Sequence, residues 1–240
     1  MKRLSPVTLV FAVLSFVFLL LLVFFRIPFP LKPLMSWQDA VDLVTPLVLI
    51  PIYWLMFKYS GSSRSTLAGE IAFLTLAVFW VLGHGMHLSA NSISNLMGKL
   101  KEGGGIDATG TDIYALTYFY DEVLSHYLRD IGVMGLAAVL IYREWRQPIG
   151  ERTAWWVVGP AAVIYGVTLF CGFVEAQTVA LGLPFTALVV LFGIVWGRRR
   201  LARQPVLAFF SASCLVALLL LVGWGLYWGG FPQFTEVGLI

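Results

Sequence analysis

Seven long apolar runs constrain what this chain can fold into. They cover residues 7–25, 40–57, 67–88, 118–142, 154–174, 176–196 and 206–227. A helix needs about 20 apolar residues to cross the hydrocarbon core of a bilayer. The sequence therefore predicts an all-α polytopic membrane protein, a bundle of seven transmembrane helices that forms a single membrane domain over residues 1–240. The longest stretch between two runs, residues 89–117, is expected to be a loop outside the membrane.

The composition agrees with a membrane protein. Hydrophobic residues make up 59% of the 240 residues and charged residues only 12%, whereas a soluble domain is about 25% charged. So little charge excludes a water-soluble globule, and so much apolar surface excludes a disordered chain. The net charge of +3 is small and scattered. We therefore expect membrane lipids as partners and no nucleic acid.

The distribution of lysine and arginine predicts the orientation of the helices. With the N-terminus in the cytoplasm, cytoplasmic segments hold eleven of these residues and outer segments hold four. Such an excess marks the cytoplasmic side of a membrane protein. The first run is longer than the apolar core of a signal peptide and lacks a cleavage site, so we interpret it as a retained span. The chain is expected in a bacterial or archaeal plasma membrane, with its C-terminus outside.

The loop 89–117 carries two local signals. Ile93, Leu96, Met97 and Leu100 recur at helical spacing, which predicts that the third helix continues as an amphipathic stretch at the interface. The glycines at 103–105 would then end it and leave a flexible cover. In the sixth run, Gly182 and Pro184 are expected to interrupt the span.

Ionisable side chains within spans are costly and mark candidate functional sites. His84, His87 and Asn91 follow one another at i, i+3 and i+7, which places them on one face of the third span. In the predicted orientation the third helix leaves the cytoplasm. These side chains are therefore expected at its outer end.

The fourth span opens with a second polar face. Glu122, Ser125, His126 and Arg129 lie at i, i+3, i+4 and i+7, whereas Asp121 points about 100° away from Glu122. Glu122 is thus the expected carboxylate partner of His126. Glu175, at the end of the fifth span, is expected in the same outer leaflet.

Histidine and carboxylate side chains on neighbouring helices are how helical bundles build metal sites. The candidate ligands are His84, His87, His126, Glu122, Asp121 and Glu175. Three imidazoles and a carboxylate favour zinc, although iron and copper also accept such ligands. Glu122 is alternatively a general base. Arg129 either holds an anionic group of a substrate or pairs with Asp130 or Glu122.

Several of these residues have simpler interpretations. Asp39 and Asp42 stand at the outer start of the second span, where an acidic residue favours the helix N-terminus. Asp121 has the same interpretation at the start of the fourth. The histidine cluster as a whole could hold the helices together without any chemistry.

The function that this pattern favours is that of an integral membrane metalloprotein with a site in the outer leaflet. We expect a metal-dependent hydrolase of a lipid or amphiphile, with Glu122 and Arg129 as catalytic residues. Alternatives are a copper or di-iron redox enzyme, a b-type haem protein with His84 or His87 paired to His126, a non-catalytic subunit, and a transporter. Transport is disfavoured because residues 71–82, 131–141 and 155–164 are almost wholly apolar and leave no polar path to the inner side.

Overall fold

The computed structural model describes residues 4–24, 27, 29, 36–102, 107–108 and 110–239. Within these ranges all regular structure is helical. The elements are α1 (Leu4–Phe24), α2 (Trp37–Tyr59), α3 (Leu67–Glu102), α4 (Asp112–Tyr118), the π-helical turn η1 (Phe119–Leu124), α5 (Ser125–Arg146), α6 (Trp155–Glu175), α7 (Val179–Phe192), the π-helical turn η2 (Gly193–Gly197), the 3-10 turn η3 (Leu201–Arg203) and α8 (Pro205–Trp228).

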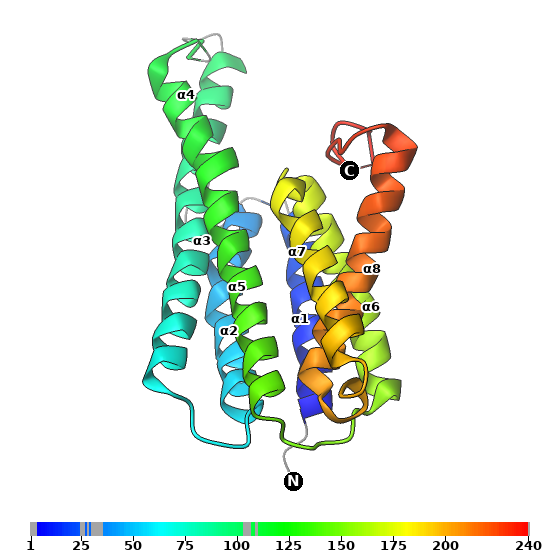
Figure 1. Cartoon of the computed structure of the whole chain (residues 1–240). Helices are drawn as coiled ribbons and strands as arrows, with labels where there is room; N and C mark the ends of the chain where they lie inside the picture. The colour runs from blue at the N-terminus through cyan, green and yellow to red at the C-terminus, as the bar shows by residue number, and fades with distance from the viewer. Residues whose placement is uncertain are drawn as a thin grey trace.

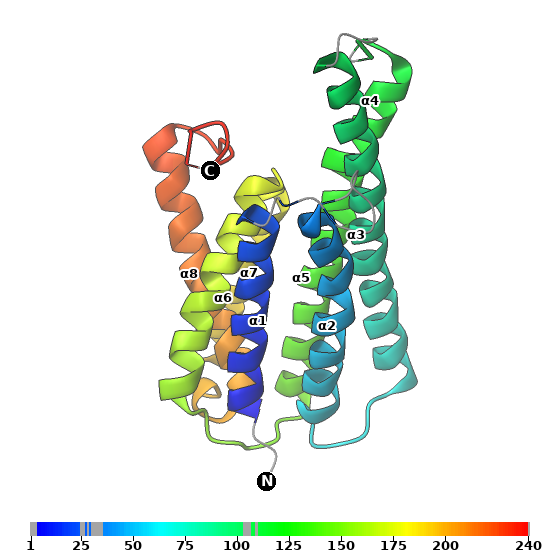
Figure 2. The same ribbon diagram turned by 180° about the vertical axis from the view of Figure 1, so that it is seen from behind.

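Seven helical segments are long and apolar enough to cross a membrane, which confirms the predicted number. They are Leu4–Val23, Trp37–Tyr59, Leu67–Lys99, Asp112–Arg146, Trp155–Glu175, Val179–Gly197 and Pro205–Trp228. The helices run side by side, and α1 begins at the end of the bundle opposite to the segment that follows α8 (Figures 1 and 2). This arrangement is expected for an odd number of spans, because each span carries the chain to the other end of the bundle.

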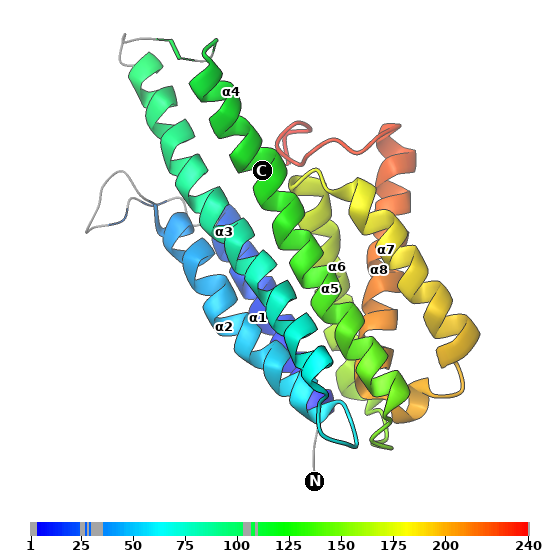
Figure 3. The same cartoon turned by 60° about the vertical axis from the view of Figure 1, so that its left-hand side comes forward.

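The region expected to be an outer loop, residues 89–117, is largely helical instead. Helix α3 continues to Glu102, as the spacing of its apolar residues predicts, and α4 already begins at Asp112. Helices α3 and α4–α5 thus form a long hairpin that extends beyond the other helices (Figure 3). The glycines at 103–105, expected to end the third helix, lie outside the described residues.

Helix α7 also differs from expectation, because it passes through Gly182 and Pro184 without interruption. Gly182 packs directly on the ring of Phe173, and a Cβ atom there would lie 2.4 Å from Phe173 Cδ2. The glycine therefore serves the packing of α7 on α6.

Helices α3 and α5 approach each other at backbone distance. A Cβ atom on Gly83 would lie 2.5 Å from the backbone nitrogen of Arg129, and one on Gly132 would lie 2.6 Å from that of Trp80. Small residues at such crossings let two membrane helices come together along their backbones. This contact fixes the distance between the polar faces of α3 and α5.

The centre of the bundle is filled by aromatic side chains. The hydroxyl groups of Tyr53 and Tyr165 lie 3.0 Å apart, and one donates a hydrogen bond to the other. The ring of Phe11 packs on both tyrosines, with centroids 4.6 and 4.9 Å away. All three side chains are buried in the core of the bundle.

We call the two ends of the helix bundle the loop end and the pocket end. The loop end carries the connections 60–66, 147–154 and 198–204, and the pocket end carries 176–178 and the C-terminal segment 229–239. Nine described lysines and arginines belong to the loop end: Lys58, Arg64, Arg143, Arg146, Arg152, Arg198, Arg199, Arg200 and Arg203. Lys99 and Lys101 belong to the other end.

Candidate functional site

A polar pocket of about 440 Å³ opens at the pocket end between α1, α2, α3, α5, α6 and the C-terminal segment. Its acidic and basic lining residues are Asp42, His87, Glu122, His126, Arg129 and Glu175. Five of these six were singled out in the sequence as functional candidates. The sixth, Asp42, was expected to be a charge at a helix start.

Asp42 is buried rather than interfacial, which corrects that expectation. Its Oδ1 atom lies 2.6 Å from Nδ1 of His84, and both residues are almost fully buried. Asp42 lies nearly one turn inside α2 from Asp39, so its side chain meets α3 at the depth of His84. Its second oxygen, Oδ2, is buried without a hydrogen-bond partner.

Asp39 does begin its helix, and it also joins α2 to α3. Its carboxylate accepts the backbone N–H of Ser36 at 2.7 Å, and the Ser36 hydroxyl accepts the N–H of Asp39 in return. This is a capping box. The other carboxylate oxygen accepts a hydrogen bond from the Asn91 amide at 3.2 Å. Asn91 and His84 therefore both join α3 to α2.

Asp121 is the second carboxylate that the sequence misplaced. It is 3% exposed, and its Oδ1 atom lies 2.9 Å from Nδ1 of His87, an ion-pair contact whose angles are not those of a hydrogen bond. The reason is the π-helical turn η1, in which the N–H of Ser125 bonds to the carbonyl of Tyr120. The wider turn changes which side chains face α3, and such turns occur frequently at functional sites.

His126 has a backbone carbonyl rather than Glu122 as its nearest partner. Its Nδ1 lies 3.2 Å from the carbonyl oxygen of Ala176, whereas Glu122 Oε2 is 4.0 Å away. Glu122 thus has an incompletely paired carboxylate that lines the pocket. The rings of His87 and His126 are close, with centroids 5.0 Å apart.

Arg129 pairs with its sequence neighbour. Its Nε donates to Asp130 Oδ1 at 2.8 Å, and the other oxygen of Asp130 accepts from the Thr178 hydroxyl. Of the two partners considered from sequence, Asp130 and Glu122, the structure has the first. The guanidinium still lines the pocket and retains donors for an anion.

Glu175 anchors the C-terminal segment over the pocket. Its Oε2 accepts the backbone N–H of Phe234 at 3.2 Å, and its carbonyl accepts from the Gln233 side chain at 2.6 Å. Gln233 and Thr235 consequently line the pocket. No sequence signal marked this segment, because only the folded chain brings it back to the end of α6.

The three histidines share one feature. Each Nδ1 lies beside an acceptor: Asp42 for His84, Asp121 for His87 and the Ala176 carbonyl for His126. Metal-binding histidines are almost always held in this way through the nitrogen that does not bind the metal. Nevertheless, no three His, Cys, Asp or Glu side chains in the described ranges are arranged so that they could hold a metal ion.

The six predicted metal ligands divide into two groups. His87, His126, Glu122 and Glu175 line the pocket, while His84 and Asp121 stand behind it as members of ion pairs. Comparisons with protein-family models, curated proteins and solved structures found no match to this chain. The geometry alone therefore carries the functional argument.

Proposed function

We propose that the protein is an integral membrane hydrolase with a transition metal, zinc before iron or copper, held by His87 and His126. One observation carries this proposal. The two imidazoles have their Nδ1 atoms beside an acceptor, and their centroids are 5.0 Å apart. Two imidazoles that share one tetrahedral zinc have centroids separated by about 5 Å, given zinc–nitrogen bonds of about 2.0–2.1 Å.

A carboxylate of the pocket would complete the ligand set. Glu122 and Glu175 both line the pocket, and one of these side chains would have to change its rotamer to join the two imidazoles, because no three ligand side chains of the described residues converge. Asp121 would orient the His87 ring rather than bind the metal. His84 would not touch the metal either, and would instead hold the Asp42 side chain in position through their contact. A bound zinc supplies a Lewis acid and an activated water in such sites.

The remaining lining residues of the pocket are of two chemical kinds. Arg129 offers guanidinium donors to an anionic group, and Glu122 would take a proton from water as a general base where Glu175 is the metal ligand. Leu19, Leu22 and Val23 of α1 add apolar surface to the same pocket. A lining with both charged and apolar side chains suits an amphiphile, such as a lipid with an anionic headgroup.

The orientation belongs to the same proposal. The gathering of lysine and arginine at the loop end supports a cytoplasmic location for that end, by the positive-inside rule. The pocket then faces the extracytoplasmic side, where an amphiphile enters from the outer leaflet. We propose the plasma membrane of a bacterium or archaeon as the location.

Metal analysis of protein purified without chelators tests the proposal. We expect about one zinc per chain in the wild type and in the control Asn95→Ala, an exposed position on α3 outside the pocket. His87→Ala and His126→Ala should lose the metal and the hydrolysis of a fluorogenic amphiphile ester. Absence of stoichiometric transition metal from the wild type would refute the metal site.

A second candidate is metal-free acid–base catalysis by His87 and Asp121. It is favoured by the finding that no three ligand side chains converge in the part of the chain that the structure describes. Under this alternative, protein treated with EDTA keeps its esterase activity, while His87→Ala and Asp121→Asn abolish it. Under the metal proposal, EDTA abolishes the activity and added zinc restores it.

A further inference from the structure

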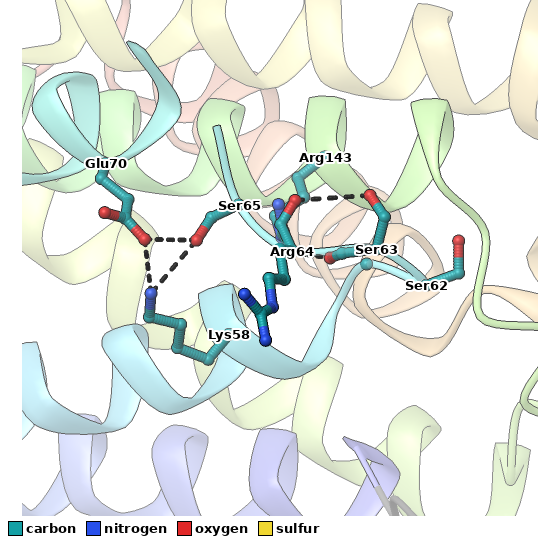
Figure 4. A pocket seen from close by; sticks show the side chains of 8 residues that line it. Lys58, Ser62, Ser63, Arg64, Ser65, Glu70 and Arg143 are labelled. Atoms are coloured by element: carbon teal, nitrogen blue, oxygen red, sulfur yellow. Dashed lines mark hydrogen bonds and ion pairs between the residues drawn. The ribbon is translucent and has the colours of Figure 1, made fainter. Parts of the chain in front are cut away.

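A second cavity, of about 480 Å³, lies at the loop end, where the connection between α2 and α3 meets α5 (Figure 4). Its lining is rich in hydrogen-bond donors: Lys58, Ser63, Arg64, Ser65 and Arg143, together with a single carboxylate, Glu70. It is separate from the pocket that carries the proposed hydrolase site, and the inference below does not depend on that site.

Lys58 stands on one side of the cavity in a small network. Its ammonium donates to Glu70 Oε1 at 2.5 Å and to the Ser65 hydroxyl at 3.1 Å, and Ser65 in turn donates to Glu70 (Figure 4). The ammonium also lies over the ring of Trp54, 4.3 Å from the centroid. An ammonium has three N–H donors. One donor is therefore left for another acceptor.

Arg143 provides a rigid cation at the back of the cavity. Its Nε donates to the carbonyl of Phe57 at 2.7 Å, and its Nη2 donates to that of Ser63 at 2.8 Å. Gly61 makes room for it, since a Cβ atom there would lie 2.8 Å from the guanidinium carbon. Two contacts use two of five guanidinium N–H groups. The others stay near the cavity at a fixed position.

Arg64 lies between these two groups on the connection (Figure 4). It is exposed, and within the described part of the chain no acceptor pairs with its guanidinium. The cavity thus holds three cationic side chains against one carboxylate. The long helix α3 also begins at this connection, and the positive end of its dipole favours an anion nearby.

We propose that this cavity binds a phosphate group, either in the headgroup of an anionic lipid or as a free phosphate-bearing solute. Guanidinium and ammonium groups with serine hydroxyls form the donor set that a phosphate requires. The cavity also lies at the end of the membrane helices, beside Trp54 and Lys58, where lipid headgroups are found. Basic side chains next to a membrane helix attract anionic lipids by about 1 kcal/mol each.

The test uses the full chain, purified in a neutral detergent. Its melting temperature is followed while short-chain phosphatidylglycerol, short-chain phosphatidylcholine or inorganic phosphate is added. Phosphatidylglycerol should raise the melting temperature and phosphatidylcholine should not. In Arg64→Ala and in Lys58→Gln the apparent affinity should fall about fivefold. Arg199→Ala, an exposed arginine at the same end but outside the cavity, should behave as the wild type.

The outcomes distinguish the two sources of phosphate. If phosphatidylglycerol acts and inorganic phosphate neither acts nor competes, the cavity binds a lipid headgroup. If inorganic phosphate acts and competes, the ligand is a soluble anion. The proposal is overturned if neither phosphatidylglycerol nor inorganic phosphate shifts the melting temperature of the wild type. It is also overturned if Arg199→Ala weakens the effect as much as Arg64→Ala does.

Discussion

The two ends of this bundle both carry ionisable side chains, but the side chains differ in burial and in their partners. At the pocket end the ionisable side chains of His84, Asp42 and Asp121 are buried, and each meets a partner from another helical element. At the loop end Arg143 is also buried and donates to backbone carbonyls, whereas Arg64 is exposed and Lys58 is joined to Glu70 across a short connection. Buried ionisable side chains therefore join one helical element to another, whereas exposed ones remain available to solvent or to a ligand.

The largest effect should follow from removing one member of a buried pair. In Asp42→Ala the His84 imidazole stays buried without its carboxylate, and breaking a buried pair in this way costs about 3–5 kcal/mol. The free energy of unfolding in mixed micelles measures this cost. The double variant Asp42→Ala/His84→Ala should be destabilised by less than the sum of the single variants. A loss below about 1 kcal/mol for Asp42→Ala would mean that the pair behaves like the exposed one at the loop end.

A somewhat smaller effect should come from the backbone contact that places the two polar faces of the pocket end. Gly83→Ala puts a Cβ atom 2.5 Å from the Arg129 nitrogen, and overpacking of this kind costs about 1–3 kcal/mol. Gly85→Ala is the matched control, because nothing lies within 4 Å of its Cβ position. It should be stabilising by about 0.5–1 kcal/mol as an alanine within a helix. Equal unfolding free energies for the two variants would contradict the close approach of α3 and α5.

The carboxylate that anchors the C-terminal segment should have an effect of about 1 kcal/mol. Glu175→Gln keeps the shape of the side chain but weakens the hydrogen bond from the Phe234 N–H, because bonds to charged acceptors are the stronger ones. Amide hydrogen exchange at Phe234 should therefore become about fivefold faster. Glu151→Gln is the control, since Glu151 accepts a backbone N–H of Leu4 at the loop end. Unchanged exchange at Phe234 in Glu175→Gln would show that the anchor is elsewhere.

The smallest effect is expected for the ion pair of the loop end. The Lys58 and Glu70 side chains are 37% and 33% exposed, and ion pairs this accessible to water contribute little to stability. Lys58→Ala should lower the melting temperature slightly at low salt. At about 1 M salt, where screening acts within about 3 Å, the difference should vanish. A salt-independent loss would indicate that Lys58 stabilises the fold through its contact with Trp54.

The sequence was sufficient for the number of membrane helices and for the clustering of polar residues. Apolar runs report spans directly, since a bilayer has a fixed thickness. The spacing of His84 and His87 on one helix and of Glu122 and His126 on another placed them on helix faces, and three of these four line the pocket. The continuation of the third helix through residues 89–102 was also readable from its apolar residues.

The pairing of the carboxylates was not predictable in the same way. Asp42 and Asp121 both resemble acidic residues at helix starts, and only packing shows that one meets His84 and the other His87. The π-helical turn η1 has no sequence signature, yet it decides that Asp121 rather than Glu122 is buried. Gln233 and Thr235 reach the pocket through a fold-back of the chain, which no local pattern indicates.

The glycine contact between α3 and α5 has a consequence for how the site meets a ligand. Because Gly83 lets the backbones of the two helices touch, main-chain packing holds the helix segments that carry His87 and His126 close together. Under the proposed function, the two imidazoles would then be close together before a metal binds, and binding would lose little free energy to rearranging the helices. The absence of a Cβ atom at Gly83 thus helps to determine how close His87 and His126 lie.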